Sequence, residues 1–199
     1  THTYSSAGTY TITVAVNDSA TKDIGEMYLN NHASRTLIRT ITNWGEGKWG
    51  SWNNSFKGAT NLTIPATDEP DLSLTTDMSS AFRDCTSLVG TTLNDWNTAA
   101  ITNMEYMFWD ATSFNGNIGS WNTAAVTKMN EMFRSATAFN QNINSWNTAA
   151  VTRMNGMFQS ASTFNQNLNS WNTAAVTSMA DLFREASSFN GNISSWNTA

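Results

Sequence analysis

Hydrophobic residues recur through most of the chain with a period of 25 positions. In one representative period, four of them follow the i, i+3, i+4, i+7 spacing of a single helical face: Met129, Met132, Phe133 and Ala136. Thr127 precedes them as a candidate N-cap. The spacing therefore predicts a short helix of about two turns, which needs packing partners to be stable.

The pattern changes on either side of this predicted helix. Trp121 and Thr123 alternate as in a short strand with both side chains pointing inward. Asn140, Gln141 and Asn142 form a polar cluster typical of a turn. Each period is thus predicted to be one coil of strand, bend, short helix and loop. Parallel strands in successive coils would lie roughly 4.8 Å apart, so six coils would span roughly 29 Å.

Aromatic residues at equivalent positions of this period are predicted to pack on one another inside the stack of coils. The predicted structural ladder contains a tryptophan row and a phenylalanine row: Trp96, Trp121, Trp146, Trp171 and Trp196, with Phe108, Phe133, Phe158 and Phe183. These rows are interpreted as core elements, so a binding function would lie on the outer surface of the stack.

The sequence upstream of the regular periods divides into two further parts. Residues 1–17 contain a run of alternating hydrophobic residues that predicts a half-buried β-strand. Residues 18–72 are predicted to be an N-terminal capping region with a degenerate first coil over 48–62, followed by a loop over 64–71 that holds both prolines. The regular coils of 25 or 26 residues are expected over 73–199.

Composition limits the classes of partner. Charged residues make up 13% of the chain, the net charge is −5 and the pI is about 4.8, which argues against nucleic acid as a partner. No hydrophobic run has the length of a membrane span. The chain starts and stops inside sequence typical of a domain, so it is expected to be a segment of a longer protein.

The repeat unit Met-Phe-x-x-Ala-x-x-Phe-Asn-x-Asn-Ile-x-x-Trp-Asn-Thr-x-x-Val-Thr-x-Met resembles the repeat of BspA-like leucine-rich-repeat surface proteins over residues 74–199. Residues 2–14 are similar to the closing strand of a PKD-type β-sandwich. The resemblance implies an α/β repeat solenoid, a leucine-rich-repeat-like right-handed coil with a parallel ladder of short strands and short helices. It also implies a secreted or cell-surface protein used in adhesion, without enzymatic activity.

Residues capable of catalysis or metal binding are scarce. Cys85 replaces a small core residue of the other repeats and is interpreted as buried filler rather than a reactive thiol. Asp68, Glu69 and Asp71 form an acidic cluster, which is interpreted as a solvated loop in preference to a calcium site. We therefore expect no enzyme activity, no cofactor and no metal.

Two residues are candidates for interaction. Trp109 occupies an outward position where other repeats carry Arg134, Gln159 or Arg184, so it is predicted to be an exposed contact residue. Trp196 ends the tryptophan row without a successor in this chain. The rows of asparagines could form a lattice for sugar or ice, although a turn and ladder role is the stronger interpretation.

Two functions follow from these observations. The first is a non-enzymatic extracellular or cell-surface module that binds a protein or glycan ligand in adhesion. The alternative is a structural subunit whose copies stack head to tail into an extracellular filament through the uncovered last coil.

Overall fold

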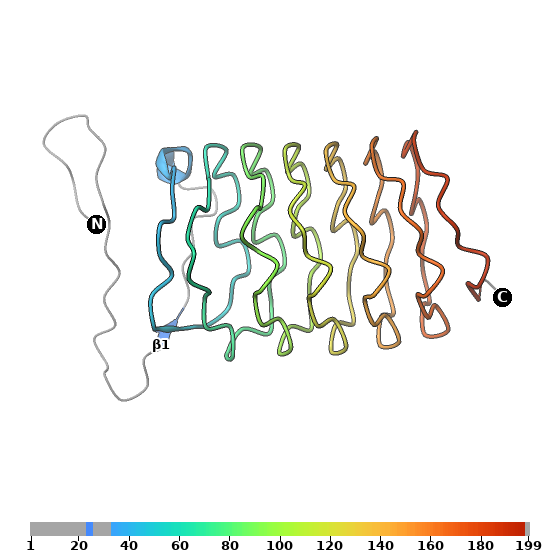
Figure 1. Ribbon diagram of the computed structural model, residues 1–199, viewed down its shortest axis with the longest axis horizontal. Coiled ribbons are helices and arrows are strands. Elements are labelled where there is room, and N and C mark those ends of the chain that lie inside the picture. The colour runs from blue at the N-terminus through green and yellow to red at the C-terminus, as the bar shows by residue number, and fades with distance from the viewer. Residues whose placement is uncertain (1–22, 26–32, 198–199) are drawn as a thin grey trace, which may run out of the picture.

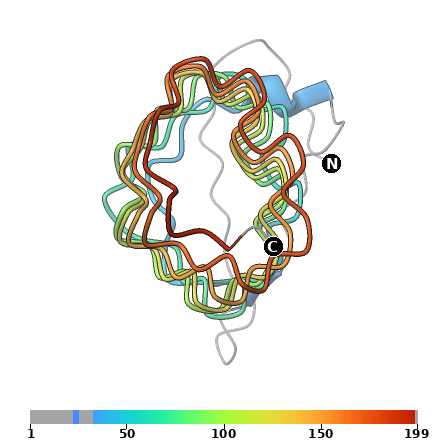
Figure 2. The ribbon, with the colours of Figure 1, turned by 90° about the vertical axis from the view of Figure 1, so that its right-hand side faces the viewer.

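A computed structural model of the chain describes residues 23–25 and 33–197. The described chain winds into a row of similar coils that stand side by side (Figure 1). Viewed along the row, successive coils overlay as a ring (Figure 2). The assigned elements are the strand β1 (Asp23–Gly25), the 3-10 helix η1 (Ala33–Leu37) and the strand β2 (Lys48–Trp49). β1 and β2 pair in parallel as a two-stranded sheet.

The predicted α/β repeat solenoid is wrong. Over the described residues the structure has no α-helix, and the regular coils contain no strand. Parallel pairing between these coils is limited to isolated bridges such as Asn103 with Lys128 and Lys128 with Arg153. The leucine-rich-repeat-like architecture of short helices and a continuous parallel ladder is therefore absent from this part of the chain.

The segment predicted to be helical is instead a series of overlapping turns. Met132, Arg134 and Ala136 each donate their N–H to the carbonyl three residues earlier. Glu131 and Ser135 have positive φ angles of 51° and 56°, and this left-handed conformation interrupts a helix. The hydrophobic residues of this segment still face the inside of the coil. The series of turns places residues with this spacing on one side of the backbone, as a helix would.

The remaining N–H groups of this segment join neighbouring coils. Glu131 donates to the carbonyl of Asn155 and Phe133 donates to that of Met157, at 2.8 and 2.9 Å. A helix would use these N–H groups internally and leave the coils unconnected at this point. Hydrogen bonding between coils thus explains why turns replace the predicted helix.

Stacked aromatic rings fill the inside of the coils. Trp121 and Trp146 lie with ring centroids 6.4 Å apart and planes parallel, and Trp146 and Trp171 are 6.3 Å apart. Phe133 and Phe158 are 5.7 Å apart. These distances between ring centroids are longer than the roughly 4.8 Å predicted between parallel strands of successive coils. They are also longer along the tryptophan row than along the phenylalanine row.

Asparagine side chains connect the coils at the turn that follows the second phenylalanine of each period. The N–H of Asn140 donates to Oδ1 of Asn115 at 3.0 Å, and the N–H of Asn165 donates to Oδ1 of Asn140 at 2.9 Å. Asn190 continues the row with a 2.7 Å bond to Asn165. A side-chain oxygen spans the gap between coils here, which gives the asparagines of this row a structural role.

A cluster of aromatic side chains packs inside the first coils. The Trp44 ring lies 5.2 Å from the Trp52 ring and 5.4 Å from the Trp96 ring, and the Trp52 and Trp96 rings are also 5.4 Å apart. All three side chains are buried. The PKD-like strand predicted within residues 1–17 lies outside the described residues. No helix in the described part of the chain has the length and hydrophobicity needed to cross a membrane.

Candidate functional site: a neutral groove beside the tryptophan row

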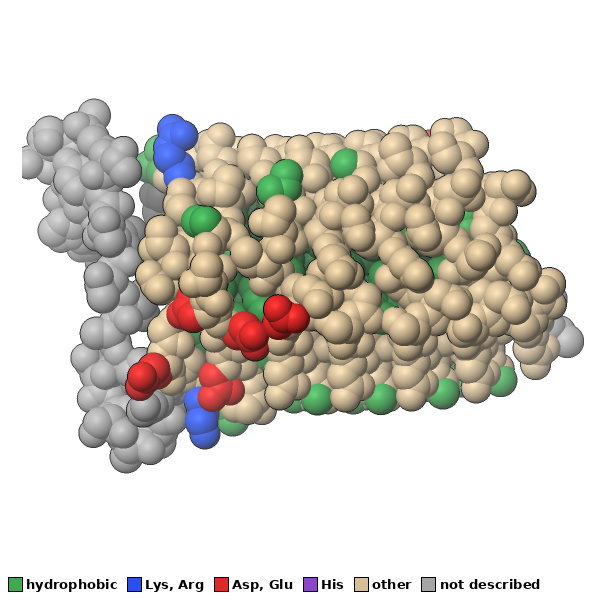
Figure 3. Space-filling view, viewed as in Figure 1, with side chains coloured by type: hydrophobic (Ala, Val, Ile, Leu, Met, Phe, Trp, Pro, Cys, Tyr) green, Lys and Arg blue, Asp and Glu red, His purple; other side chains and the backbone are tan. Residues whose placement is uncertain are grey.

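Apart from Asp95, the regular coils carry their charges in only one part of each period. Residues 111–127, 135–152 and 154–180 contain no Asp, Glu, Lys or Arg, and these segments include asparagine turns and Trp121, Trp146 and Trp171. On the face shown in Figure 3, acidic and basic side chains lie over the first coils, whereas the later coils present an almost entirely neutral surface. Neutral hydrogen-bonding groups therefore dominate a large part of the molecule's surface.

A groove of about 870 Å³ lies on this neutral part of the coils. Its lining comes from four successive coils and contains asparagine, serine, glycine and one edge of a tryptophan: Asn94, Asn117, Gly119, Ser120, Asn142, Asn144, Ser145, Trp146, Asn147 and Ser170. None of these side chains is titratable. The groove can therefore bind by hydrogen bonding and van der Waals contact, but its lining offers no general acid, general base or charged nucleophile.

The turns hold the groove asparagines in place by their oxygen atoms. Oδ1 of Asn142 accepts the N–H of Asn144 at 3.0 Å, and Oδ1 of Asn147 accepts the N–H of Ala149 at 3.1 Å. Asn117 makes the same contact with the N–H of Gly119. Each of these local bonds fixes the side-chain orientation within an Asx turn.

The amide nitrogens of the same asparagines remain free to donate. Nδ2 of Asn117, Asn142 and Asn147 has no hydrogen-bond acceptor among the described residues, and all three residues are exposed. Asn144 differs, because its Nδ2 donates to Oγ of Ser170 at 2.9 Å. The groove thus presents several fixed N–H donors that point away from the turns holding them.

The tryptophans of the ladder form the inner wall behind this groove. Trp146 is 2% exposed, and its indole N–H donates to the carbonyl of Ile118 at 3.0 Å. Trp121 and Trp171 make equivalent bonds one coil before and one coil after. Trp96, Trp121, Trp146 and Trp171 are thus buried inside the coils with Phe108, Phe133 and Phe158, and their faces are not available to a ligand.

Trp109 is half-buried and its ring is covered. The Arg83 guanidinium lies 3.6 Å from the ring centroid and that of Arg134 lies 4.7 Å from it, from the preceding and the following coil. Tyr106 packs beside the same ring, with centroids 5.7 Å apart. Trp109, which the sequence predicts as an exposed contact residue, thus has two cations over its ring, at positions where a sugar ring would stack.

Trp196 is also half-buried, with one stacked tryptophan neighbour, Trp171, at 6.1 Å. Its coil includes other partly buried hydrophobic residues, among them Phe183 and Phe189. The two predicted interaction residues, Trp109 and Trp196, lie in different coils and neither lines the groove.

The acidic loop and the cysteine have structural roles. Oδ2 of Asp68 accepts the N–H groups of Trp44 and Gly45 at 2.8 and 2.9 Å. Hydrogen bonds from Ser73 and the nearby Lys48 hold the pKa of Asp71 below its usual value. Burial raises the pKa of Cys85, which stabilises the thiol over the reactive thiolate. No group of three or more potential metal ligands gathers in the described part of the chain.

The sequence does not locate the groove. It favours a turn and ladder role for the asparagine rows over a lattice for sugar or ice, and the row through Asn115 and Asn140 has the ladder role in the structure. The sequence signal for a ligand-binding role of asparagine is the Trp-Asn-Thr step that recurs in the periods. In Asn147 the side-chain oxygen accepts the N–H of Ala149, while the amide nitrogen has no acceptor among the described residues.

Comparison with known proteins gives one family. The family model described as "Mycoplasma protein of unknown function, DUF285" matches residues 50–150 and 116–199. The two matches overlap and together span most of the chain, including all the regular coils. They do not identify a BspA-like or leucine-rich-repeat family, nor a PKD domain. Neither the curated proteins nor the solved structures include a significant match.

Proposed function

We propose that this chain, which belongs to the DUF285 family, is a non-enzymatic surface module. Its ligands are neutral glycans, which bind in the groove. The observation that carries the proposal is the chemistry of the groove lining, which has fixed, unpaired amide N–H donors and no ionisable side chain. Sugar hydroxyls are neutral and accept such hydrogen bonds, whereas a charged ligand would find no counter-ion.

The shape of the groove supports an extended ligand. The lining is contributed by four coils, and related asparagines recur from coil to coil, as Asn117 and Asn142 do. Successive sugar units of an oligosaccharide can therefore meet similar donors along the stack. The resemblance of the repeats to BspA-like surface proteins further supports an extracellular or cell-surface location and a role in adhesion.

The test replaces one amide nitrogen without changing the turn. In Asn147→Asp, the carboxylate can still accept the N–H of Ala149, but the Nδ2 donor is lost. Asn172→Asp is the matched control, because Asn172 caps Ala174 at 3.0 Å in the same way but does not line the groove. Both variants add one negative charge in the same row.

Binding is measured against an array of neutral oligosaccharides, followed by calorimetry with the best ligand. We expect a Kd at least about tenfold higher for Asn147→Asp and a nearly unchanged Kd for Asn172→Asp, as loss of one or two hydrogen bonds predicts. Absence of any glycan binding by the wild-type chain, or equal effects of the two variants, contradicts the proposal.

A second candidate is association of copies through the coil formed by residues 176–196. The segment 179–185 presents four backbone N–H groups without an acceptor among the described residues, those of Met179, Asp181, Phe183 and Glu185. In preceding coils the equivalent N–H groups donate to carbonyls of the next coil. A carbonyl edge from a second copy would satisfy them and cover Phe183 and Trp196.

Sedimentation velocity over a range of concentrations tests this association. Head-to-tail stacking predicts a sedimentation coefficient that rises with concentration, and it predicts that Phe183→Asp, which places a charge on the apolar face, abolishes the rise. A single monomeric species at high concentration contradicts the association and leaves glycan binding by the groove unaffected.

A further inference from the structure

The surface around Trp109 departs from the repeat in two neighbouring positions. Where Tyr106 stands, the other regular coils have Ser80, Glu131, Gly156 or Asp181, and Trp109 replaces an arginine or glutamine. Both positions face outward and do not contribute to the core. Core packing therefore does not require an aromatic residue at either Tyr106 or Trp109. Tyr, Trp and Arg are also the residues that dominate protein-binding hot spots.

The cluster is assembled from three successive coils. Arg83, Trp109 and Arg134 lie in consecutive coils, and the two guanidinium groups contact the indole ring between them. Tyr106 lies against the ring from the same coil. Stacking restrains the arginine side chains, so a ligand that they bind encounters them already positioned.

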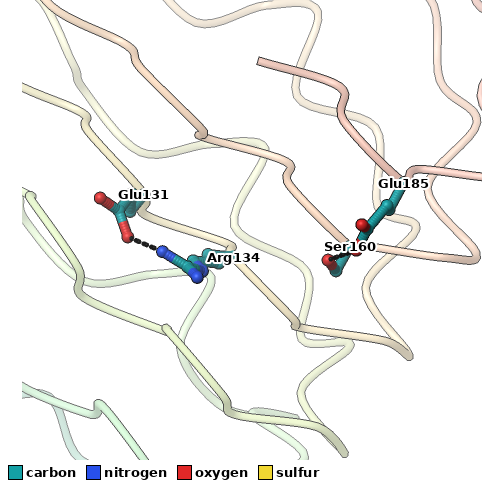
Figure 4. Close-up of polar contacts among 4 residues, drawn as sticks. All are labelled: Glu131, Arg134, Ser160 and Glu185. Atoms are coloured by element: carbon teal, nitrogen blue, oxygen red, sulfur yellow. Dashed lines mark hydrogen bonds and ion pairs between the residues drawn. The ribbon is translucent and has the colours of Figure 1, made fainter. Parts of the chain in front are cut away.

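The two arginines differ in their hydrogen bonds. Nη1 of Arg134 donates to a carboxylate oxygen of Glu131 at 2.7 Å (Figure 4), so its charge is compensated. Arg83 has only a loose ion pair, with Nε 3.7 Å from a carboxylate oxygen of Asp84. The terminal nitrogens of Arg83 have no hydrogen-bond partner among the described residues. The two terminal nitrogens of Arg83, the fork of its guanidinium group, are thus available to a ligand.

The charges nearby limit the ligand that this fork can take. Asp84, Glu105 and Glu131 lie on the same segment of the coils, and they disfavour an anion with more than one charge. A single carboxylate matches the single free fork and can bind it through two parallel hydrogen bonds. The phenol and indole beside it provide contact area for a neighbouring apolar side chain.

We propose that the cluster of Arg83, Tyr106, Trp109 and Arg134 is a protein-docking site that binds a single carboxylate side chain, flanked by apolar residues, of a partner protein. This site is separate from the groove, and it does not depend on glycan binding. The chain would then carry two interaction surfaces of different chemistry, one neutral along the tryptophan row and one built on arginine and aromatic residues.

The experiment uses a peptide with blocked ends, a neutral fluorophore and one glutamate flanked by leucines, measured by fluorescence anisotropy. The same peptide with glutamine in place of the glutamate is the second probe, and inorganic phosphate is tested as a competitor. The variants are Arg83→Gln, Trp109→Gln and the control Arg184→Gln. Gln159 occupies the row of Trp109 one coil beyond Arg134, so glutamine is compatible with this position.

We expect the glutamate peptide to bind at least about tenfold more tightly than the glutamine peptide, in line with a charge-assisted bidentate contact. Arg83→Gln and Trp109→Gln should each raise the Kd at least about tenfold, and Arg184→Gln should leave it unchanged. Equal binding of the two peptides, an unchanged Kd in Arg83→Gln, or complete competition by millimolar phosphate overturns the proposal. Arg83→Gln alone decides the matter if Trp109→Gln does not fold.

Discussion

Replacing a tryptophan inside the row should cost more stability than replacing the last one. Trp146 is stacked between Trp121 and Trp171, is 2% exposed, and donates its indole N–H to the carbonyl of Ile118. Trp196 has a tryptophan on one side only and is half-buried. The indole N–H of Trp196 also donates to a carbonyl, that of Leu168. The comparison of Trp146→Ala with Trp196→Ala therefore reports what the second stacked neighbour and the burial it provides contribute.

The expected magnitudes follow from burial. A tryptophan side chain of about 200 Å² contributes up to about 5 kcal/mol by area, which is an upper bound. Trp146→Ala opens a cavity between two rings and removes one of the two hydrogen bonds to the Ile118 carbonyl, so we expect a loss of about 4 kcal/mol. Trp196→Ala should cost less, because this side chain is partly exposed and has a stacked tryptophan on one side only.

Urea denaturation followed by far-UV circular dichroism measures both losses. The wild-type chain and the two variants are compared at equal temperature and pH, and the m-value shows whether unfolding stays cooperative in a chain built of repeats. Equal losses of stability in the two variants would refute the reasoning, because they would mean that a second stacked neighbour contributes nothing.

Three further predictions concern other contacts. Asn140→Ala removes the oxygen that accepts the N–H of Asn165 and should destabilise the chain by about 1–2 kcal/mol, whereas Asn140→Asp keeps an acceptor and should cost less; chemical denaturation distinguishes them. Cys85 is buried and its pKa is raised, so a thiol reagent at pH 8 should label it only after denaturant is added. The lowered pKa of Asp71 stabilises the folded state above the pKa of the unfolded chain, and this contribution is lost as the pH falls below about 4; the melting temperature of Asp71→Asn should therefore decline less over that range than that of the wild type.

The sequence identifies which side chains face inward but not the backbone conformation that places them there. Met129 and Phe133 are fully buried, as their spacing indicates. The same spacing suits a helix and a series of turns, and the choice is made by hydrogen bonds to a coil 25 residues away. The positive φ of Glu131 has no sequence signal, since glutamate is not a residue that favours the left-handed region.

The candidate sites were harder to predict than the core because they depend on contacts between periods. Trp109 could be singled out as a departure from the repeat, but its enclosure by Arg83 and Arg134 follows only when the three coils are stacked. The groove required knowledge of which atom of each asparagine the turn uses. Asn147 illustrates this, because its oxygen is bonded locally and its nitrogen is left for a ligand.

Binding of neutral glycans to the free amide nitrogens of the groove is tested by the side-chain amide signals in a ¹H–¹⁵N correlation spectrum. On titration with a neutral oligosaccharide identified by the array, the Nδ2 signals of Asn142 and Asn147 should shift with saturation, while that of Asn172 stays in place. Saturable shifts elsewhere with none at Asn142 and Asn147, or no shift with any neutral oligosaccharide, would contradict the account.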